Sequence, residues 1–233
     1  MEKLQIAKDL IKRRAIDIVR RKIERLKTPM DMVVLTLKAQ KDLPEPLIAL
    51  ELFGGLGLGH TADYEPLCSY LELWEIKPNY AKFAKKLFKT ATVKTGDSIK
   101  AIKEKKLLRE SYNFIVIDNL WGCCNQEYYE HFDLFSAIFD FLGPKKGVLI
   151  LSVLYNMDEI VLKEGNIPQE ATRKIKEFYG INGDKGVINL DAKKVIDIYK
   201  NKVPRGKFNI TSTFLVPRSS FIAYLVMVIE RNG

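Results

Sequence analysis

The sequence contains few of the residues on which many functional sites depend. Its 233 residues include three cysteines and two histidines. Cys123 and Cys124 are adjacent and Cys68 is distant, so they predict neither a disulfide framework nor a zinc site built from cysteine pairs. His60 and His131 lack the partner spacing of a metal site or a catalytic triad. We therefore expect no metal ion and a reducing compartment.

Long apolar runs are also absent. The longest, residues 221–229, is far too short for a membrane-spanning helix. The N-terminus shows no apolar core followed by a small-residue cleavage site, so we expect no signal peptide. Hydrophobic residues nevertheless make up 47% of the chain, which is enough for a sizeable core. These features predict a soluble cytoplasmic protein without a membrane partner, and they leave the oligomeric state open.

The net charge of +9 is unevenly distributed. Residues 1–27 carry ten Lys and Arg against four Asp and Glu, which is six of the nine net positive charges. Apolar residues recur there at three- and four-residue spacing, which predicts one amphipathic helix over residues 3–27. Such a basic helix attracts RNA or DNA through the phosphate backbone, or it is simply a solvated helix face.

A second helix is expected after this segment. Thr28 has the side chain of a helix cap and is followed by proline, and the helix should run to about Lys41. Two further prolines then interrupt the chain. We therefore predict a helical extension over residues 1–45 and a core domain over residues 46–233.

The core domain alternates apolar strands with helices. We expect strands at residues 47–53, 69–75, 92–94, 112–118 and 147–153, and helices at 79–88, 98–108 and 127–142. Nearly all-apolar strands that alternate with helices predict a parallel sheet covered on both faces.

The C-terminal part departs from this alternation. An insertion over residues 154–205 should hold two helices, at about 168–179 and 191–201. Two long strands, 208–216 and 220–230, then follow with only three residues between them, so they must form an antiparallel hairpin. The predicted fold is therefore α/β and Rossmann-like, with seven strands, a mostly parallel sheet and a C-terminal antiparallel hairpin.

A glycine-rich turn follows the first predicted strand. Gly54, Gly55 and Gly57 allow the backbone to turn tightly and to approach a ligand closely. Glu75 stands twenty residues after Gly55, at the end of the second strand. A carboxylate in that position can accept hydrogen bonds from both ribose hydroxyls of a nucleoside cofactor.

These residues resemble the class I S-adenosylmethionine-dependent methyltransferases. The first motif of that family is an acid followed by glycines at every second position, and Glu51, Gly55 and Gly57 fit it, with Phe53 at the first glycine site. The resemblance implies a Rossmann-like fold, methyltransferase activity and S-adenosylmethionine as cofactor. It also implies cofactor contacts by Glu51, Phe53, Gly54, Gly55, Gly57, Glu75, Ile76, Asp97, Ser98 and Asp118.

The alternative enzyme class is a nicotinamide-dependent oxidoreductase, which shares the strand, the glycine turn and the distal acid. Its fingerprint requires a further glycine where this sequence has His60. The C-terminal hairpin also disfavours it. Only residues 58–67, with a proline among them, separate the turn from the second strand, so the helix there should be short or irregular.

The fourth strand ends in the candidate catalytic residues. Asp118, Asn119 and Trp121 resemble the Asp-Pro-Pro-Tyr signature of methyltransferases that modify exocyclic amino groups of bases, without its prolines. On this interpretation Asp118 accepts a hydrogen bond from the target and Trp121 stacks on an extruded base. On the alternative interpretation Asp118 caps the next helix and Trp121 packs locally.

Three functions therefore remain open. The first is methylation of RNA or DNA, which the basic segment 1–27 and the Asp118–Trp121 sequence favour slightly. The second is methylation of a small molecule or a protein. The third is a non-catalytic subunit that binds S-adenosylmethionine, because the fourth-strand motif is degenerate. The adjacent Cys123 and Cys124 lack the context of a cytosine-C5 nucleophile and are read as ordinary thiols.

Overall fold

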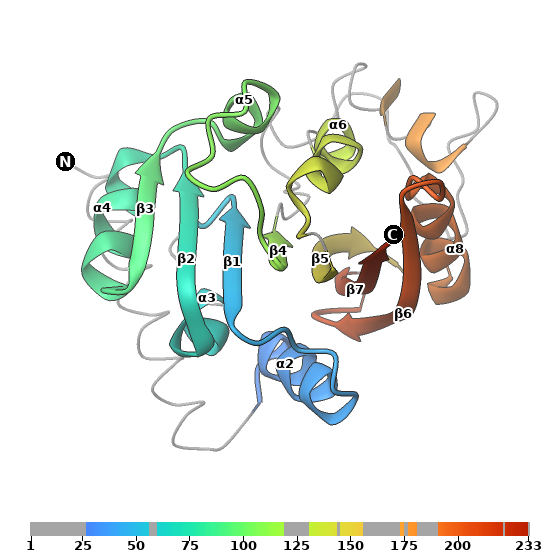
Figure 1. The fold of residues 1–233 in the computed structure, drawn as a ribbon. Coiled ribbons are helices and arrows are strands. Elements are labelled where there is room, and N and C mark those ends of the chain that lie inside the picture. Colours follow the sequence, from blue (N-terminus) through green and yellow to red (C-terminus); the bar gives the residue numbers. More distant parts are fainter. Residues whose placement is uncertain are drawn as a thin grey trace.

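The protein is described from a computed structural model, drawn in Figure 1. The structure describes residues 27–55, 60–118, 131–143, 145–155, 173–174, 177–180, 191–220 and 222–232. None of the helices in these ranges has the length and apolar character needed to cross a membrane. Residues 1–26 of the basic segment and most of the predicted insertion lie outside the described residues.

The described strands form one seven-stranded sheet in the order β3-β2-β1-β4-β5-β7-β6. They are β1 (Leu47–Leu52), β2 (Cys68–Glu75), β3 (Ala91–Thr95), β4 (Phe114–Ile117), β5 (Lys146–Leu154), β6 (Phe208–Pro217) and β7 (Ile222–Arg231). The strands from β3 to β5 are parallel, and β7 lies antiparallel between β5 and β6. The predicted fold class and the hairpin are confirmed.

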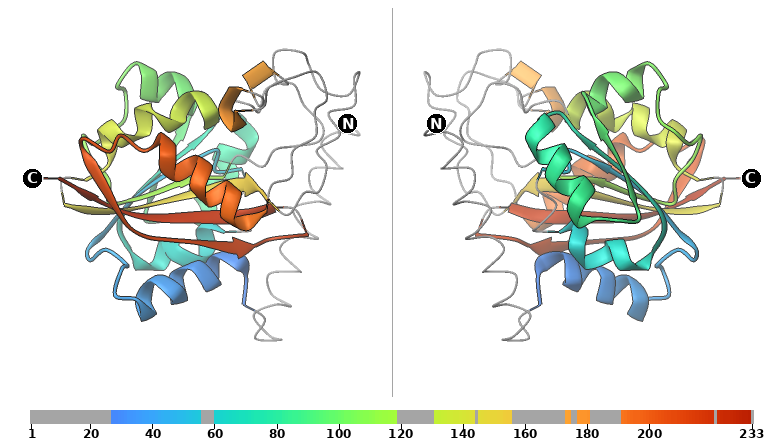
Figure 2. Two further views of the ribbon diagram at one scale, coloured as in Figure 1. Left: turned by 90° about the vertical axis from the view of Figure 1, so that its right-hand side faces the viewer. Right: turned by 90° about the vertical axis from the view of Figure 1, so that its left-hand side faces the viewer.

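Helices cover both faces of this sheet, as Figure 2 shows. They are α2 (Pro29–Ala39), α3 (Thr61–Tyr64), the 3-10 turn η1 (Glu65–Leu67), α4 (Pro78–Leu87), α5 (Ser98–Lys103), α6 (His131–Phe135), the 3-10 turn η2 (Ala137–Phe141) and α8 (Ala192–Lys202). One core forms between the sheet and the layer of α5, α6, η2 and α8, and α2 and α3 close a second core on the opposite face. The strands are apolar on both sides because both sides are covered.

Helix α2 begins as its sequence predicts and packs on the sheet. The Thr28 hydroxyl accepts a hydrogen bond from the Asp31 N–H at 3.0 Å, and the Asp31 side chain accepts one from the Thr28 N–H at 3.2 Å. This reciprocal pair is a capping box. The buried residues of α2, spaced by three and four, join strand residues in one core: Met30, Val33, Val34 and Leu37. A domain boundary at residue 45 stays a prediction.

Two predicted helices are shorter in the structure. The helix predicted over residues 98–108 ends at Lys103, because Lys105 takes a left-handed conformation with φ of 53°. The N–H of Lys106 then bonds to the Ala101 carbonyl and that of Lys105 to the Ile102 carbonyl, which closes the helix end in a Schellman motif. The helix predicted over 127–142 is, from residue 131, the two short pieces α6 and η2.

Candidate functional site

The glycine turn lies at the carboxyl end of β1 and is held against β2. The Gly54 N–H donates to the Trp74 carbonyl at 2.9 Å. A Cβ atom on Gly54 would lie 2.5 Å from Cδ2 of Leu73, so only glycine fits there without a shift. Gly55 has φ of 54°, in the left-handed region that favours glycine. The turn therefore has the tight backbone path that the sequence predicts, and Gly57 lies outside the described residues.

Phe53 occupies the position of the first glycine in the family motif. Its φ is 63°, a left-handed conformation that costs a non-glycine residue about 1–2 kcal/mol. Its partly buried side chain packs against the core that contains Leu50 and Leu52. Packing of the aromatic ring therefore offsets strain in the backbone at this position.

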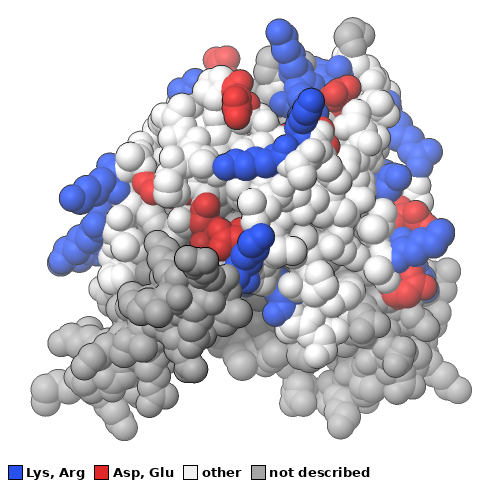
Figure 3. Space-filling model, turned by 90° about the horizontal axis from the view of Figure 1, so that it is seen from below, with Lys and Arg blue, Asp and Glu red and all other residues white. Residues whose placement is uncertain are grey.

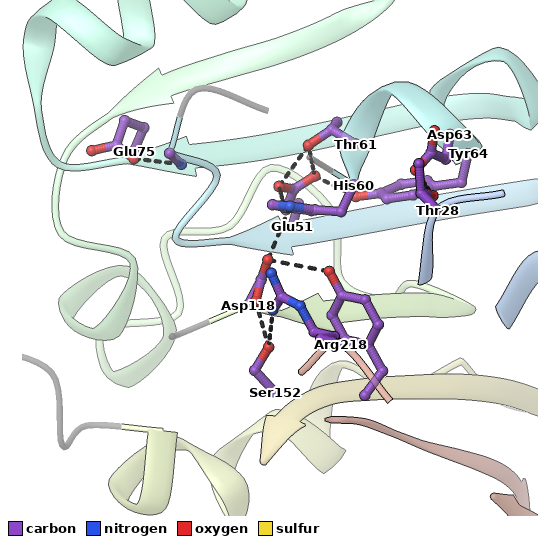
Figure 4. A network of polar contacts seen from close by, with 12 residues as sticks. Thr28, Glu51, His60, Thr61, Asp63, Tyr64, Glu75, Asp118, Ser152 and Arg218 are labelled. Carbon is purple, nitrogen blue, oxygen red and sulfur yellow. Dashed lines mark hydrogen bonds and ion pairs between the residues drawn. The ribbon is translucent and has the colours of Figure 1, made fainter. Parts of the chain in front are cut away.

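Glu75 lies at the end of β2, beside the glycine turn, as Figure 4 shows. Its Oε2 accepts a hydrogen bond from the Gly55 N–H at 2.7 Å, and its Oε1 accepts one from the Lys77 N–H at 2.7 Å. Burial raises the pKa of this carboxyl, and the two backbone N–H groups oppose that rise. A carboxylate has about four acceptor positions, so, as far as the described residues show, each oxygen retains one for a ligand hydroxyl.

The next strand contributes Asp97 to the same edge. Its Oδ1 accepts hydrogen bonds from the N–H groups of Ile99 at 2.8 Å and Lys100 at 3.1 Å, so Asp97 caps α5. The Gly96 N–H donates to the Glu75 carbonyl at 3.0 Å, which holds the two acidic residues on neighbouring strand ends. Ile76, between them in sequence, is 58% exposed.

Glu51 is fully buried, and its carboxylate is surrounded by donors from the segment that follows the turn. His60 Nε2 lies 2.6 Å from Oε1, and the Thr61 hydroxyl lies 2.8 Å from both oxygens. The Tyr64 hydroxyl donates to Oε2. Burial, followed by the charge of Glu51, raises the pKa of Tyr64 well above its usual value, so it stays a donor. Glu51 thus contacts His60 and α3, and the cofactor contact predicted for it stays a prediction.

The His60 ring bridges two carboxylates. Nε2 faces Glu51, and Nδ1 lies 2.9 Å from Oδ2 of Asp118. A neutral imidazole can donate from only one nitrogen, so an ionised carboxylate at each ring nitrogen favours the doubly protonated ring. Burial lowers the pKa of His60, but the charges of Asp118 and Glu51 outweigh that effect and raise it to about 10. His60 is therefore a buried cation near neutral pH.

Asp118 connects this bridge to the C-terminal hairpin. Its Oδ2 also receives the Tyr224 hydroxyl at 3.4 Å, and its Oδ1 receives the Ser152 hydroxyl and Nη1 of Arg218. Arg218 Nη1 also donates to Ser152 Oγ at 2.6 Å, and the guanidinium carbon lies 4.4 Å from the centre of the Tyr224 ring. The cluster of Glu51, His60, Asp118 and Arg218 is hereafter the charged bridge (Figure 4).

The charged bridge bears on the role predicted for Asp118. Burial alone would raise the pKa of this carboxyl, but His60 and Arg218 hold it well below its usual range. Two donors on each oxygen fill its acceptor positions. Asp118 is therefore a charged anchor here, and a catalytic contact with the target stays a prediction. Asn119 and Trp121 lie outside the described residues.

Two residues of the charged bridge, His60 and Arg218, are not among the candidate residues that the sequence predicts. The sequence predicts no partner for His60, although only nine positions separate it from Glu51. Arg218 follows β6 in the hairpin turn, and β7 runs antiparallel to β5 with Leu154 opposite Ile222. The hairpin turn therefore lies at the same sheet edge as the carboxyl end of β5. The predicted hairpin already indicates that Arg218 lies near the carboxyl end of β5.

Comparisons with known proteins bear on the fold. No family model matches the chain, and no curated protein matches it by sequence. Among solved structures, the CurJ carbon methyltransferase aligns with a TM-score of 0.52 and 14% identity, over 88% of this chain and 54% of that one. The N-methyltransferase NodS from Bradyrhizobium japonicum WM9 aligns with a TM-score of 0.51 and 13% identity, over 88% and 98%.

A third solved structure was determined with ligands. The Burkholderia thailandensis 1,6-didemethyltoxoflavin-N1-methyltransferase, bound to 1,6-didemethyltoxoflavin and S-adenosylhomocysteine, aligns with a TM-score of 0.50 and 14% identity. The alignment covers 98% of this chain and 88% of that one. Sequence identities of 13% and 14% show a similarity of fold alone. The chain has the class I S-adenosylmethionine-dependent methyltransferase fold, as its motifs predict.

Proposed function

We propose that this protein is an S-adenosylmethionine-dependent methyltransferase that binds its cofactor across the glycine turn, Glu75 and Asp97. The observation that carries the proposal is the geometry of Glu75. Its carboxylate lies at the end of β2 in a sheet of the methyltransferase order, and each oxygen retains an acceptor position beside one backbone N–H. Two such positions suit the two hydroxyls of a ribose.

The topology also supports this proposal against a nicotinamide-dependent oxidoreductase. In the dinucleotide-binding fold the sixth strand continues the parallel sheet, whereas here β7 is antiparallel to β5. The third glycine of the dinucleotide fingerprint would stand at position 60, where close packing of helix and strand requires the smallest residue. His60 instead places an imidazolium between β1 and β4.

The proposed chemistry asks the protein mainly to position reactants. The cofactor supplies an activated methyl group. The chain must hold the acceptor lone pair in line with that group and exclude water, a task of geometry. Gly54 and Gly55 fix the turn and Glu75 orients the ribose. For Asp97, which caps α5 at the neighbouring strand end, we propose a contact with the base.

For the acceptor we propose a nucleic-acid base, on the support of the basic segment 1–27. Figure 3 looks at the molecule from the side of α2, where the described Lys and Arg stand apart around a mostly uncharged centre. The proposal therefore depends on the N-terminal segment. The alternative is a small molecule, favoured by the Burkholderia neighbour that was crystallised with one.

Calorimetric titration with S-adenosylhomocysteine, with NAD as the control ligand, tests the cofactor. We expect binding of S-adenosylhomocysteine alone, and binding of NAD alone would refute the proposal. For the acceptor, RNA binding should weaken steeply as salt rises and should be lost when residues 1–26 are deleted. RNA affinity unchanged by that deletion, in a protein that still binds S-adenosylhomocysteine, would refute the nucleic-acid proposal.

A further inference from the structure

The glycine turn is bracketed by the two residues of one buried ion pair. Glu51 immediately precedes residues 52–59 in sequence, and His60 immediately follows them. The side chains of these two residues meet at 2.6 Å, and His60 is 8% exposed. The same ring reaches Asp118 at the end of β4. A single side chain thus joins both ends of the glycine segment to the neighbouring strand.

We propose that His60 is a positioning residue, a fixed cation that holds Glu51 and Asp118 together and thereby keeps Gly54 and Gly55, at the end of β1, in the conformation that binds the cofactor. The inference rests on the proposed function, because it assigns His60 a role in that same site. His60 acts through the position of the backbone, and its two ring nitrogens are already occupied by carboxylates.

Charge balance is the physical reason for a cation at this position. Glu51 and Asp118 are buried, and two buried carboxylates on one neutral ring would repel each other. With His60 and Arg218 charged, the four groups of the charged bridge sum to zero. A neutral residue at position 60 leaves one uncompensated negative charge, which is strongly unfavourable in a buried site. One carboxylate must then take up a proton or the segment must move.

The groups that face His60 set the pH range of this effect. Glu51 approaches from β1 with Thr61 and Tyr64 of α3 around it. Asp118 approaches from the end of β4, with Ser152, Arg218 and Tyr224 on its far side. His60 stays charged near neutral pH, and Tyr64 and Tyr224 stay neutral because burial raises the pKa of each. When the His60 charge is removed, Glu51 and Asp118 are therefore the first groups whose protonation changes.

The test is calorimetric titration of His60→Gln with S-adenosylhomocysteine at pH 6, 7 and 8. We expect the affinity of the wild type to be nearly constant over this range. The variant should bind about tenfold more weakly or worse at pH 8, and should recover affinity at pH 6 as a carboxylate takes up a proton. A residue with only a packing role would give a loss that does not depend on pH.

Two further variants sharpen the test. Tyr64→Phe removes a neutral donor from the same Glu51 carboxylate and leaves the charge unchanged. It should keep the affinity independent of pH, with a loss of about threefold or less. Glu51→Gln combined with His60→Gln restores charge balance, because Asp118 and Arg218 remain paired. That double variant should bind more tightly at pH 8 than His60→Gln alone and should lose the pH dependence.

The outcomes separate the two proposals. If the wild type binds S-adenosylhomocysteine and His60→Gln matches it at every pH, the role of His60 is refuted and the proposed function stands. A pH-independent loss in His60→Gln that the double variant does not reverse also refutes the role. If the wild type itself fails to bind, the proposed function is refuted and this inference with it. Circular dichroism checks that each variant is folded. Glutamine is chosen for position 60 because its side-chain amide can still donate a hydrogen bond to a carboxylate.

Discussion

The charged bridge predicts that the protein loses stability in mildly alkaline solution, and that His60 causes the loss. The pKa of His60 is 6.5 in its ordinary state and about 10 in the folded protein. Between these values the folded protein holds a proton that the unfolded chain has released, so the free energy of unfolding falls as pH rises. One proton corresponds to about 1.4 kcal/mol per pH unit, so the loss from pH 7.5 to 9.5 is on the order of 2 kcal/mol.

Urea unfolding of the wild type and of His60→Gln, followed by circular dichroism at pH 7.5, 8.5 and 9.5, measures this loss. The free energy of unfolding of the wild type should fall with pH at nearly the slope for one proton. For the variant that slope should be smaller by the same amount. Burial raises the pKa of the Cys68 thiol to about 12, which also lowers stability at the alkaline end. That contribution is common to both proteins and cancels in their difference. Equal slopes in the two proteins would show that His60 carries no buried charge.

Three further changes test other parts of the structure. Gly54→Ala should lower the free energy of unfolding by about 1–3 kcal/mol through its clash with Leu73, and Leu73→Ala in the same chain should relieve part of the added strain. Glu75→Ala should abolish calorimetric binding of S-adenosylhomocysteine, and unchanged affinity would contradict the ribose contact. Thr28→Ala should lower the free energy of unfolding by about 1 kcal/mol in urea, whereas Thr28→Ser should keep the cap.

The strands and the C-terminal hairpin could be predicted because they depend on local patterns. The buried run Phe114–Ile117 can only be a strand between neighbours, and a three-residue connection between two long strands forces a hairpin. The short helix after the turn was also predictable, since α3 and η1 are all that fits before β2. Glu75 was found because the distance from the glycine turn to the end of the next strand varies little in this fold.

The charged bridge could not be predicted in the same way, because it joins Glu51 and His60 to residues that are distant in sequence. Asp118 and Arg218 are 100 residues apart and meet only because β7 enters the sheet against β5. The early end of α5 has a similar cause. The chain leaves the helix at Lys105, and the Leu108 N–H then reaches the buried carboxylate of Glu72 at 3.2 Å. Helical propensity over residues 104–108 yields to that tertiary contact.

The surroundings of Asp118 restrict the chemistry that this edge of the sheet can perform. A general base needs an available lone pair and a pKa near the working pH. Asp118 has neither in this structure, since both oxygens hold two donors and two cations keep its pKa low. Such a carboxylate instead fixes the position of Arg218 and His60. On the proposed function, removal of a proton from the methyl acceptor would therefore fall to another group. An acceptor nitrogen that already has a free lone pair would need no proton removed before methyl transfer.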